Sequence, residues 1–306
     1  MRELDGVTMG TSWSAKIVDP PRGIAAEIAT VLDTVITQMS QWESASQLSR
    51  INATTPGSWH PIAPEFAHVM TAALDIADRS NGAFDPAMGV PANLWGFGPS
   101  GPRSDTPTEA EITAAHTASG RDALDFDPLL LRLRRTRAVR LDLSGIAKGY
   151  AVDTVAARLR ALGCADFLVE IGGELVGAGI QPDGQPWWVD LETPPGTAFA
   201  PLRIALHGIA VATSGDYARA FEADGTRYAH TIDPRTGRPI TNHVVSVTVI
   251  HNQCMHADAW ASALTVLGPD EGMALAEREG LAAHMLVRKA GQPRELLSLA
   301  LLGMLG

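Results

Sequence analysis

The sequence predicts an α+β fold in which largely antiparallel or mixed β-sheets are flanked by helices. Segments with apolar residues at helical spacing are prominent in the first half of the chain, and short strand-like runs dominate the second half. Strands and helices do not alternate regularly, so the pattern differs from a βαβ repeat with its parallel sheet. The length of 306 residues suits one large domain or two small ones.

The helices are predicted from spacing and from their stop signals. Apolar residues recur every three to four positions in 23–39 and in 64–79, and the second segment ends at Asn81-Gly82. A third helix follows Lys148 and stops at Gly163. A fourth covers about 257–267, ends at Gly268-Pro269, and is followed by a fifth that begins near Asp270.

Short runs rich in β-branched and apolar residues predict the strands. They are 14–19, 138–143, 166–173, 187–192, 202–213 and 244–250. The stretch 100–121, rich in Pro, Thr, Ser and acidic residues, is expected to be a surface excursion. The apolar end of the chain, 296–306, is about half the roughly 20 residues that a membrane-spanning helix needs, so it predicts a terminal element packed on the core.

Composition excludes several classes of protein. The 24 Lys and Arg against 34 Asp and Glu give a net charge of −10, without a basic block, so a nucleic-acid partner is not expected. Cys164 and Cys254 show no metal-binding spacing and predict two buried thiols, with a disulfide as the alternative. The first 13 residues lack the apolar core of a signal peptide. We therefore expect a cytoplasmic protein as the sequence stands, or an exported one if a leader has been removed.

Residues 142–153, DLSGIAKGYAVD, predict a strand end, a glycine-bearing turn and a helix. Backbone N–H groups at a helix start, with Lys148 beside them, form a site for a phosphate. The likeness to a P-loop is loose, since GxxxxGK[ST] is missing. A simple turn with a solvated Lys148 is the alternative interpretation.

Asp258 and Ser262 are four residues apart in a predicted helix, so both side chains face the same side. A carboxylate and a hydroxyl placed in this way can supply part of the oxygen shell of a hard cation, completed by water and ligand phosphates. The alternative is that Asp258 caps the helix and Ser262 is a small packing residue.

Histidine and aromatic residues mark the remaining segments. His230 precedes a tight turn built by Pro234 and Gly237 and could act as a general base, or simply make surface hydrogen bonds. Trp95 and Phe97 could stack on a planar ring or fill the core. Three shorter segments point to a ligand less directly: 82–86, 171–173 and 213–217.

Taken together, these segments resemble the ApbE family of FAD:protein FMN transferases from about residue 9 to 286. The most specific matches are GIAKGYAVD and the block from TSGDY to HTIDPRTG, and MHADAWASALTVLG agrees with the family as well. The resemblance implies one ApbE-like domain over 1–306, with an FAD cleft between its two halves. It also implies Mg²⁺-dependent transfer of FMN from FAD to a Thr or Ser hydroxyl of a partner flavoprotein, with release of AMP.

The resemblance also implies site residues. His230 takes the position of the base, and the metal ligands would be Asp258, Ser262 and the backbone carbonyl of Ala147. Lys148 and Asp153 lie in the same motif, 142–153, as the expected FAD contacts Ser144 and Tyr150, and are counted with them. The FAD contacts themselves would be Met9, Trp42, Ala83, Phe84, Asp85, Ser144, Tyr150 and the backbone near Ile232.

Two residues depart from the family pattern. Trp42 stands where Tyr is usual, which keeps a flat ring but moves its polar group. Ser262 stands where Thr is common and retains the hydroxyl. Two other functions use the same residues: an Mg²⁺-dependent FAD pyrophosphatase that gives FMN and AMP, and a carrier that binds FAD without turnover.

Overall fold

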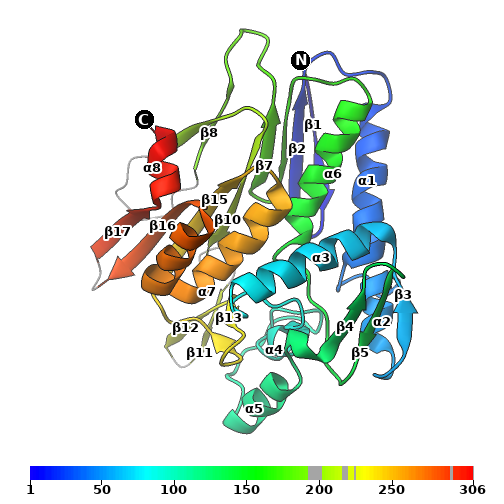
Figure 1. The fold of residues 1–306 in the computed structure, drawn as a ribbon, viewed down its shortest axis with the longest axis vertical. Helices are drawn as coiled ribbons and strands as arrows, with labels where there is room; N and C mark the ends of the chain where they lie inside the picture. Colours follow the sequence, from blue (N-terminus) through cyan, green and yellow to red (C-terminus); the bar gives the residue numbers. More distant parts are fainter. Residues whose placement is uncertain (192–201, 216–219, 224, 290–291, 306) are drawn as a thin grey trace.

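The computed structural model describes residues 1–191, 202–215, 220–223, 225–289 and 292–305. An eight-stranded sheet forms its centre, and each strand runs antiparallel to its neighbours (Figure 1). The α+β prediction is confirmed. In spatial order the strands are β1 (Arg2–Thr8), β2 (Thr11–Ile17), β6 (Phe167–Ile171), β7 (Glu174–Ala178), β10 (Ile209–Gly215), β15 (Val244–His251), β16 (Ala282–Lys289) and β17 (Gln292–Leu297).

Four helices cover one face of this sheet (Figure 1). Helices α6 and α7 lie on the strands, whereas α1 packs on α6 and α3 packs on α7. The alternation of strand residues supplies the apolar layer between them, for example Ala210 and Ala212 of β10. The bounds are α1 (Ile24–Met39), α3 (Pro64–Arg79), α6 (Ala147–Ala161) and α7 (Cys254–Glu279).

The opposite face carries a smaller core. Val211 of β10 pairs in register with Leu175 and Ile250, and all three side chains belong to this second cluster. It is covered by the hairpin of β8 (Trp187–Asp190) and β9 (Arg203–Leu206) and by the C-terminal helix α8 (Leu299–Leu305). Leu301 of α8 is fully buried, so the predicted packing of the chain end on the core is confirmed.

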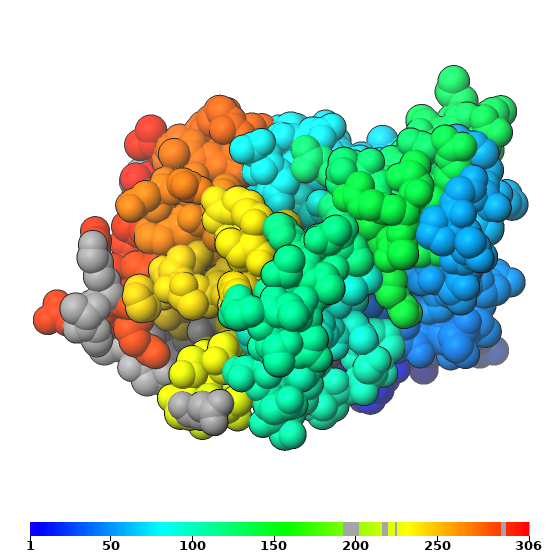
Figure 2. Space-filling view, turned by 90° about the horizontal axis from the view of Figure 1, so that it is seen from below, coloured from blue at the N-terminus to red at the C-terminus, as the bar shows by residue number. Residues whose placement is uncertain are grey.

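The other elements gather beyond one end of the sheet, at the bottom of Figure 1. Seen from that end, the segment around α5 lies side by side with the β11 to β14 region (Figure 2). These elements are α2 (Gln47–Ala53), β3 (Trp59–Pro61), α4 (Gly89–Leu94), α5 (Glu109–Thr117), the 3₁₀ helix η1 (Arg121–Ala123), β4 (Leu124–Asp127), β5 (Arg132–Arg135), β11 (Ala220–Ala223), β12 (Thr226–Ala229), β13 (Ile232–Asp233) and β14 (Arg238–Pro239).

The predicted helices agree with the structure, and α7 contains the predicted break at Gly268, whose φ of 79° and ψ of −172° are not helical. One predicted strand, 138–143, is wrong, and the predicted run 202–213 is divided into β9 and β10 at His207 and Gly208. The Asn52 side chain donates to the Leu141 carbonyl and accepts from its N–H, at 2.9 and 2.7 Å. These bonds occupy backbone groups that a strand would use, and a single bridge from Met88 to Arg140 remains.

The stretch 100–121 is not wholly irregular, because it contains α5. This helix begins with a capping box in which Thr108 and Glu111 satisfy each other's backbone N–H groups. Glu192, at the end of a predicted strand, lies outside the described residues. None of the described helices has the length and apolar character that crossing a membrane requires.

Candidate functional site

A cavity of about 770 Å³ opens near the starts of α6 and α7. Its walls also include the β1–β2 turn, the end of α1 and the loop after it, the β6–β7 turn and the end of β10. Segments that are far apart in the sequence therefore meet here. Eight of the predicted site residues line the cavity: Met9, Trp42, Ser144, Ala147, Lys148, His230, Asp258 and Ser262.

Asp258 and Ser262 lie one turn apart on α7. Asp258 is 5 % exposed, and its Oδ2 accepts a hydrogen bond from the Gly149 N–H at 3.0 Å. Burial raises the pKa of the Asp258 carboxyl, while the Lys148 ammonium and the Gly149 N–H oppose that shift. Ser262 faces the start of α6, since a Cβ added at Gly145 would lie 3.0 Å from its Oγ.

These groups fit a hard cation. A carboxylate, a hydroxyl and the nearby backbone of Ala147 are oxygen donors of the kind that Mg²⁺ prefers, and Mg²⁺ usually keeps several waters or substrate phosphates as further ligands. Among the described residues, no group of three or more His, Cys, Asp or Glu side chains is arranged to hold a metal ion. A cation held by these groups would therefore need further ligands from water or from a bound molecule.

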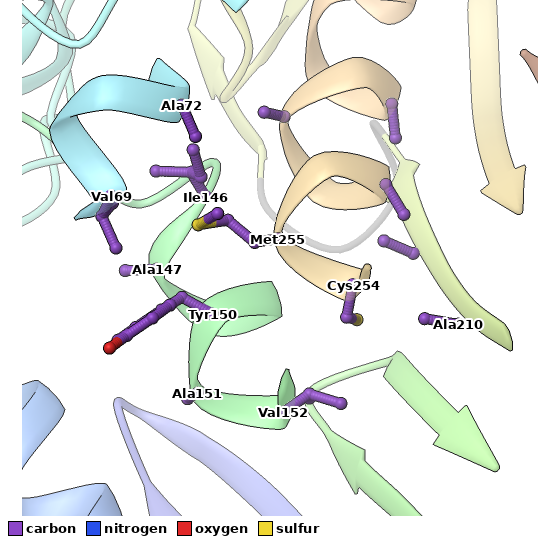
Figure 3. Close-up of a cluster of buried hydrophobic side chains, with 14 of the residues drawn as sticks. Val69, Ala72, Ile146, Ala147, Tyr150, Ala151, Val152, Ala210, Cys254 and Met255 are labelled. Carbon is purple, nitrogen blue, oxygen red and sulfur yellow. The ribbon is translucent and has the colours of Figure 1, made fainter. Parts of the chain in front are cut away.

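The close approach of α6 and α7 creates this donor set. A Cβ added at Gly149 would lie 2.4 Å from the Cys254 carbonyl oxygen, so the contact requires glycine. Asp153 accepts hydrogen bonds from the N–H groups of Cys254 and Met255, at 2.8 and 2.9 Å, and caps α7. Figure 3 shows Met255 beside Ile146, among side chains of the shared core. Asp153 therefore ties the start of α7 to α6, and neither Asp153 nor Tyr150 is among the residues that line the cavity.

The sequence analysis missed Glu174, which begins β7 and lines the cavity. It follows Gly172 and Gly173, whose φ values of 63° and 99° favour glycine. Glu174 is 1 % exposed, its Oε1 pairs with the Lys148 ammonium, and its buried Oε2 has no hydrogen-bond partner among the described residues. An acidic residue directly after a glycine pair in the motif was the available signal.

Two carboxylates, Glu174 and Asp258, act on the charge of the Lys148 ammonium. Burial lowers the pKa of the Lys148 ammonium, but Glu174 and Asp258 outweigh that effect and raise it. Burial in turn raises the pKa of the Glu174 carboxyl, against the opposing influence of Lys148. Lys148 thus remains a cation at the cavity wall.

The outer part of the cavity is formed by turns and loops. Trp42 is 51 % exposed and presents a flat ring. Met9 and Gly10 form the β1–β2 turn with φ values of 48° and 74°. Gln41 donates from Nε2 to the Ser144 hydroxyl at 3.0 Å, which ties the loop after α1 to the segment before α6.

His230 lies between β12 and β13 and is half-buried at the cavity. Phe97 meets its ring edge-on at a centroid distance of 6.2 Å. Behind it, Phe221 stacks on Tyr228 at 5.1 Å, and Trp95 donates from Nε1 to the Gly237 carbonyl at 2.8 Å. The core-filling interpretation of Trp95 and Phe97 thus agrees with the structure, because both support the segment that carries His230 and neither lines the cavity.

Four other predicted FAD contacts are not among the residues that line the cavity: Ala83, Phe84, Asp85 and Ile232. Phe84 is closest, since a Cβ at Gly145 would be 3.3 Å from its ring. Asp85 accepts from the N–H groups of Ala87 and Arg121, at 2.7 and 2.9 Å. Burial raises the pKa of Asp85, and these bonds oppose the shift. In the segment 213–217, Asp216 and Tyr217 lie outside the described residues.

The fold and the oxygen donors in this cavity are those of a known family of proteins. The model of the ApbE family matches residues 9–285, and the chain therefore belongs to the ApbE family. The resemblance seen in the sequence is confirmed.

Relatives and solved structures agree over nearly the whole chain. A Vibrio cholerae protein named FAD:protein FMN transferase is 40 % identical over 292 residues, which cover 93 % of this chain and 87 % of the relative. The apo crystal structure of Pseudomonas stutzeri flavinyl transferase ApbE gives a TM-score of 0.90 at 40 % identity, covering 98 % of this chain and 95 % of that one. The flavin transferase ApbE from Vibrio cholerae gives 0.92 at 36 % identity, covering 99 % and 98 %. These names also confirm the prediction that the chain is an enzyme.

Proposed function

We propose that this chain transfers FMN from FAD to a Thr or Ser hydroxyl of an acceptor flavoprotein, with Mg²⁺, and releases AMP. The observation that carries the proposal is the convergence of three kinds of group in one cavity: the cation Lys148, the oxygen donors Asp258 and Ser262, and the imidazole of His230. The relatives named FAD:protein FMN transferase support the same reaction.

In the proposed step, the acceptor oxygen attacks the phosphorus atom of the FMN half. The bond from that phosphorus to the bridging oxygen breaks, and AMP leaves with this oxygen. His230 accepts the proton of the attacking hydroxyl, which is the role of a general base. Phosphoryl transfer depends mainly on positioning and charge, so the arrangement of these side chains is central.

The chain's residues divide the tasks of binding and charge stabilisation. Lys148 and the backbone at the start of α6 face the pyrophosphate, while the exposed ring of Trp42 offers a surface for the isoalloxazine. Asp258, Ser262 and the Ala147 carbonyl would hold Mg²⁺. When bound, the ion would neutralise part of the negative charge that develops on the leaving phosphate.

The test uses FAD, Mg²⁺ and a flavoprotein fragment that carries an acceptor threonine. We expect intact-mass spectrometry to show a gain equal to one FMN phosphoester, lost with EDTA and lost when the threonine is replaced by alanine. Release of AMP and free FMN, without a mass gain, would instead indicate the pyrophosphatase. Tight FAD binding with neither product would indicate the carrier.

A further inference from the structure

The proposed function gives Lys148 a role but leaves its acidic partner unexplained. Glu174 is among the most buried charged residues, with 1 % exposure, and its Oε1 contacts the Lys148 ammonium. The Gly172-Gly173 turn directs the start of β7 to this point. A Cβ at Gly172 would lie 2.8 Å from the Thr11 side chain, so the β6–β7 turn is closely packed there.

Lys148 has two carboxylates in reach and pairs with only one of them. Its ammonium contacts Glu174, and Asp258 is near enough to raise the pKa of Lys148. Within the described part of the chain, however, Asp258 forms no ion pair, and its Oδ2 bonds the Gly149 N–H. The Asp258 carboxylate thus retains acceptor capacity toward the cavity.

We infer that Glu174 is a positioning residue that holds the Lys148 ammonium away from Asp258, so that the Asp258 carboxylate stays available for the cation. This inference rests on the proposed function, because it takes Asp258 as a metal ligand. Without the contact to Glu174, nothing holds the Lys148 ammonium away from Asp258. An ammonium paired with Asp258 competes directly with a divalent cation for the same oxygen atoms.

The experiment measures binding of Mn²⁺, as a stand-in for Mg²⁺, by electron paramagnetic resonance, with and without saturating FAD. Three variants are compared with the wild type: Glu174→Gln, Lys148→Met and the double variant. We expect Glu174→Gln to weaken Mn²⁺ binding about tenfold or more, because the Lys148 ammonium then pairs with Asp258 in a partly buried site. We expect Lys148→Met to bind Mn²⁺ at least as tightly as the wild type, and the double variant to recover wild-type binding.

Recovery in the double variant separates positioning from structural damage, because a second substitution would not repair a distorted fold. Glu27→Gln is the matched control, since it removes the acidic partner of Arg158 in an ion pair outside the cavity, and it should leave Mn²⁺ binding unchanged. Wild-type binding in Glu174→Gln, or weak binding that persists in the double variant, would overturn the inference. Absence of Mn²⁺ binding in the wild type would overturn the metal assignment and this inference together. Mn²⁺ binding as expected without FMN transfer would refute the transfer reaction alone.

Discussion

The inner and outer parts of the cavity are built in different ways. The inner part, formed by Lys148, Glu174, Asp258 and Ser262, comes from helices and a strand, and Glu174 is 1 % exposed. The outer part, formed by Met9, Trp42 and His230, comes from turns and loops, and Trp42 is 51 % exposed. Charges that hold a cation need fixed positions, which regular elements supply. The ring of Trp42 and the imidazole of His230, which are proposed to meet FAD and the acceptor, instead lie in loops at the outer part of the cavity.

The largest effect is expected for Asp258→Ala. It removes the only carboxylate among the proposed metal ligands, so Mg²⁺-dependent turnover should fall at least about 10³-fold. The measurement is the rate of FMN attachment against Mg²⁺ concentration. Turnover close to that of the wild type at low Mg²⁺ would show that Asp258 is not a principal metal ligand. It would also contradict the proposal that the inner part holds Mg²⁺.

His230→Gln should have the next largest effect. Loss of a general base costs typically 10²–10⁴-fold in rate, and we expect about 10²-fold in kcat with the KM for FAD little changed. Steady-state kinetics with acceptor protein provide the test. An equal fall in FAD affinity would show that His230 binds the flavin and has no part in proton transfer.

Gly149→Ala tests how closely the two helices under the inner part must pack. The added methyl would lie 2.4 Å from the Cys254 carbonyl oxygen, and overpacking of this kind costs about 1–3 kcal/mol of unfolding free energy. Gly303→Ala is the matched control, because a Cβ there meets nothing within 4 Å. In urea unfolding, Gly149→Ala should lose unfolding free energy relative to the wild type, whereas Gly303→Ala should not. Equal stability would mean that α6 and α7 can move apart freely.

Trp42→Ala should weaken FAD binding about tenfold while kcat changes little, because an exposed ring at the cavity mouth contributes binding energy more than chemistry. Trp42→Tyr, which introduces the residue usual in the family, should restore most of the affinity. Fluorescence titration with FAD measures both. Unchanged affinity in Trp42→Ala would place the isoalloxazine elsewhere.

The smallest effect concerns a histidine pair outside the cavity. Burial, together with the smaller effect of the His251 ring at a centroid distance of 5.2 Å, lowers the pKa of His256 to about 4. Between pH 6.5 and 4 the unfolded chain therefore binds more protons at this residue than the folded chain does, so stability falls as the pH falls. The loss should be on the order of 1 kcal/mol after solvent screening.

Urea unfolding at pH 7 and pH 4.5 tests this expectation. His256→Gln should show a smaller loss of stability between the two pH values than the wild type. An identical loss in both proteins would refute the assignment of this pH dependence to His256.

The sequence predicted the helices and the residues around the cavity better than it predicted contacts between distant segments. Asp258 and Ser262 share a helix face by spacing alone, and the structure places both at the cavity. The pairing of Lys148 with Glu174 joins residues 26 positions apart through a glycine turn, and no periodicity encodes it. The strand predicted at 138–143 failed for a similar reason, since the hydrogen bonds from Asn52 cross 89 positions.

The most direct test of the account is the stoichiometry of the products. In a single reaction with FAD, Mg²⁺ and acceptor fragment, AMP is quantified by chromatography and attached FMN by intact mass. The account predicts one AMP for each FMN bound to the acceptor hydroxyl, at every time point. AMP that accumulates with an equal amount of free FMN, while the acceptor keeps its original mass, would contradict it.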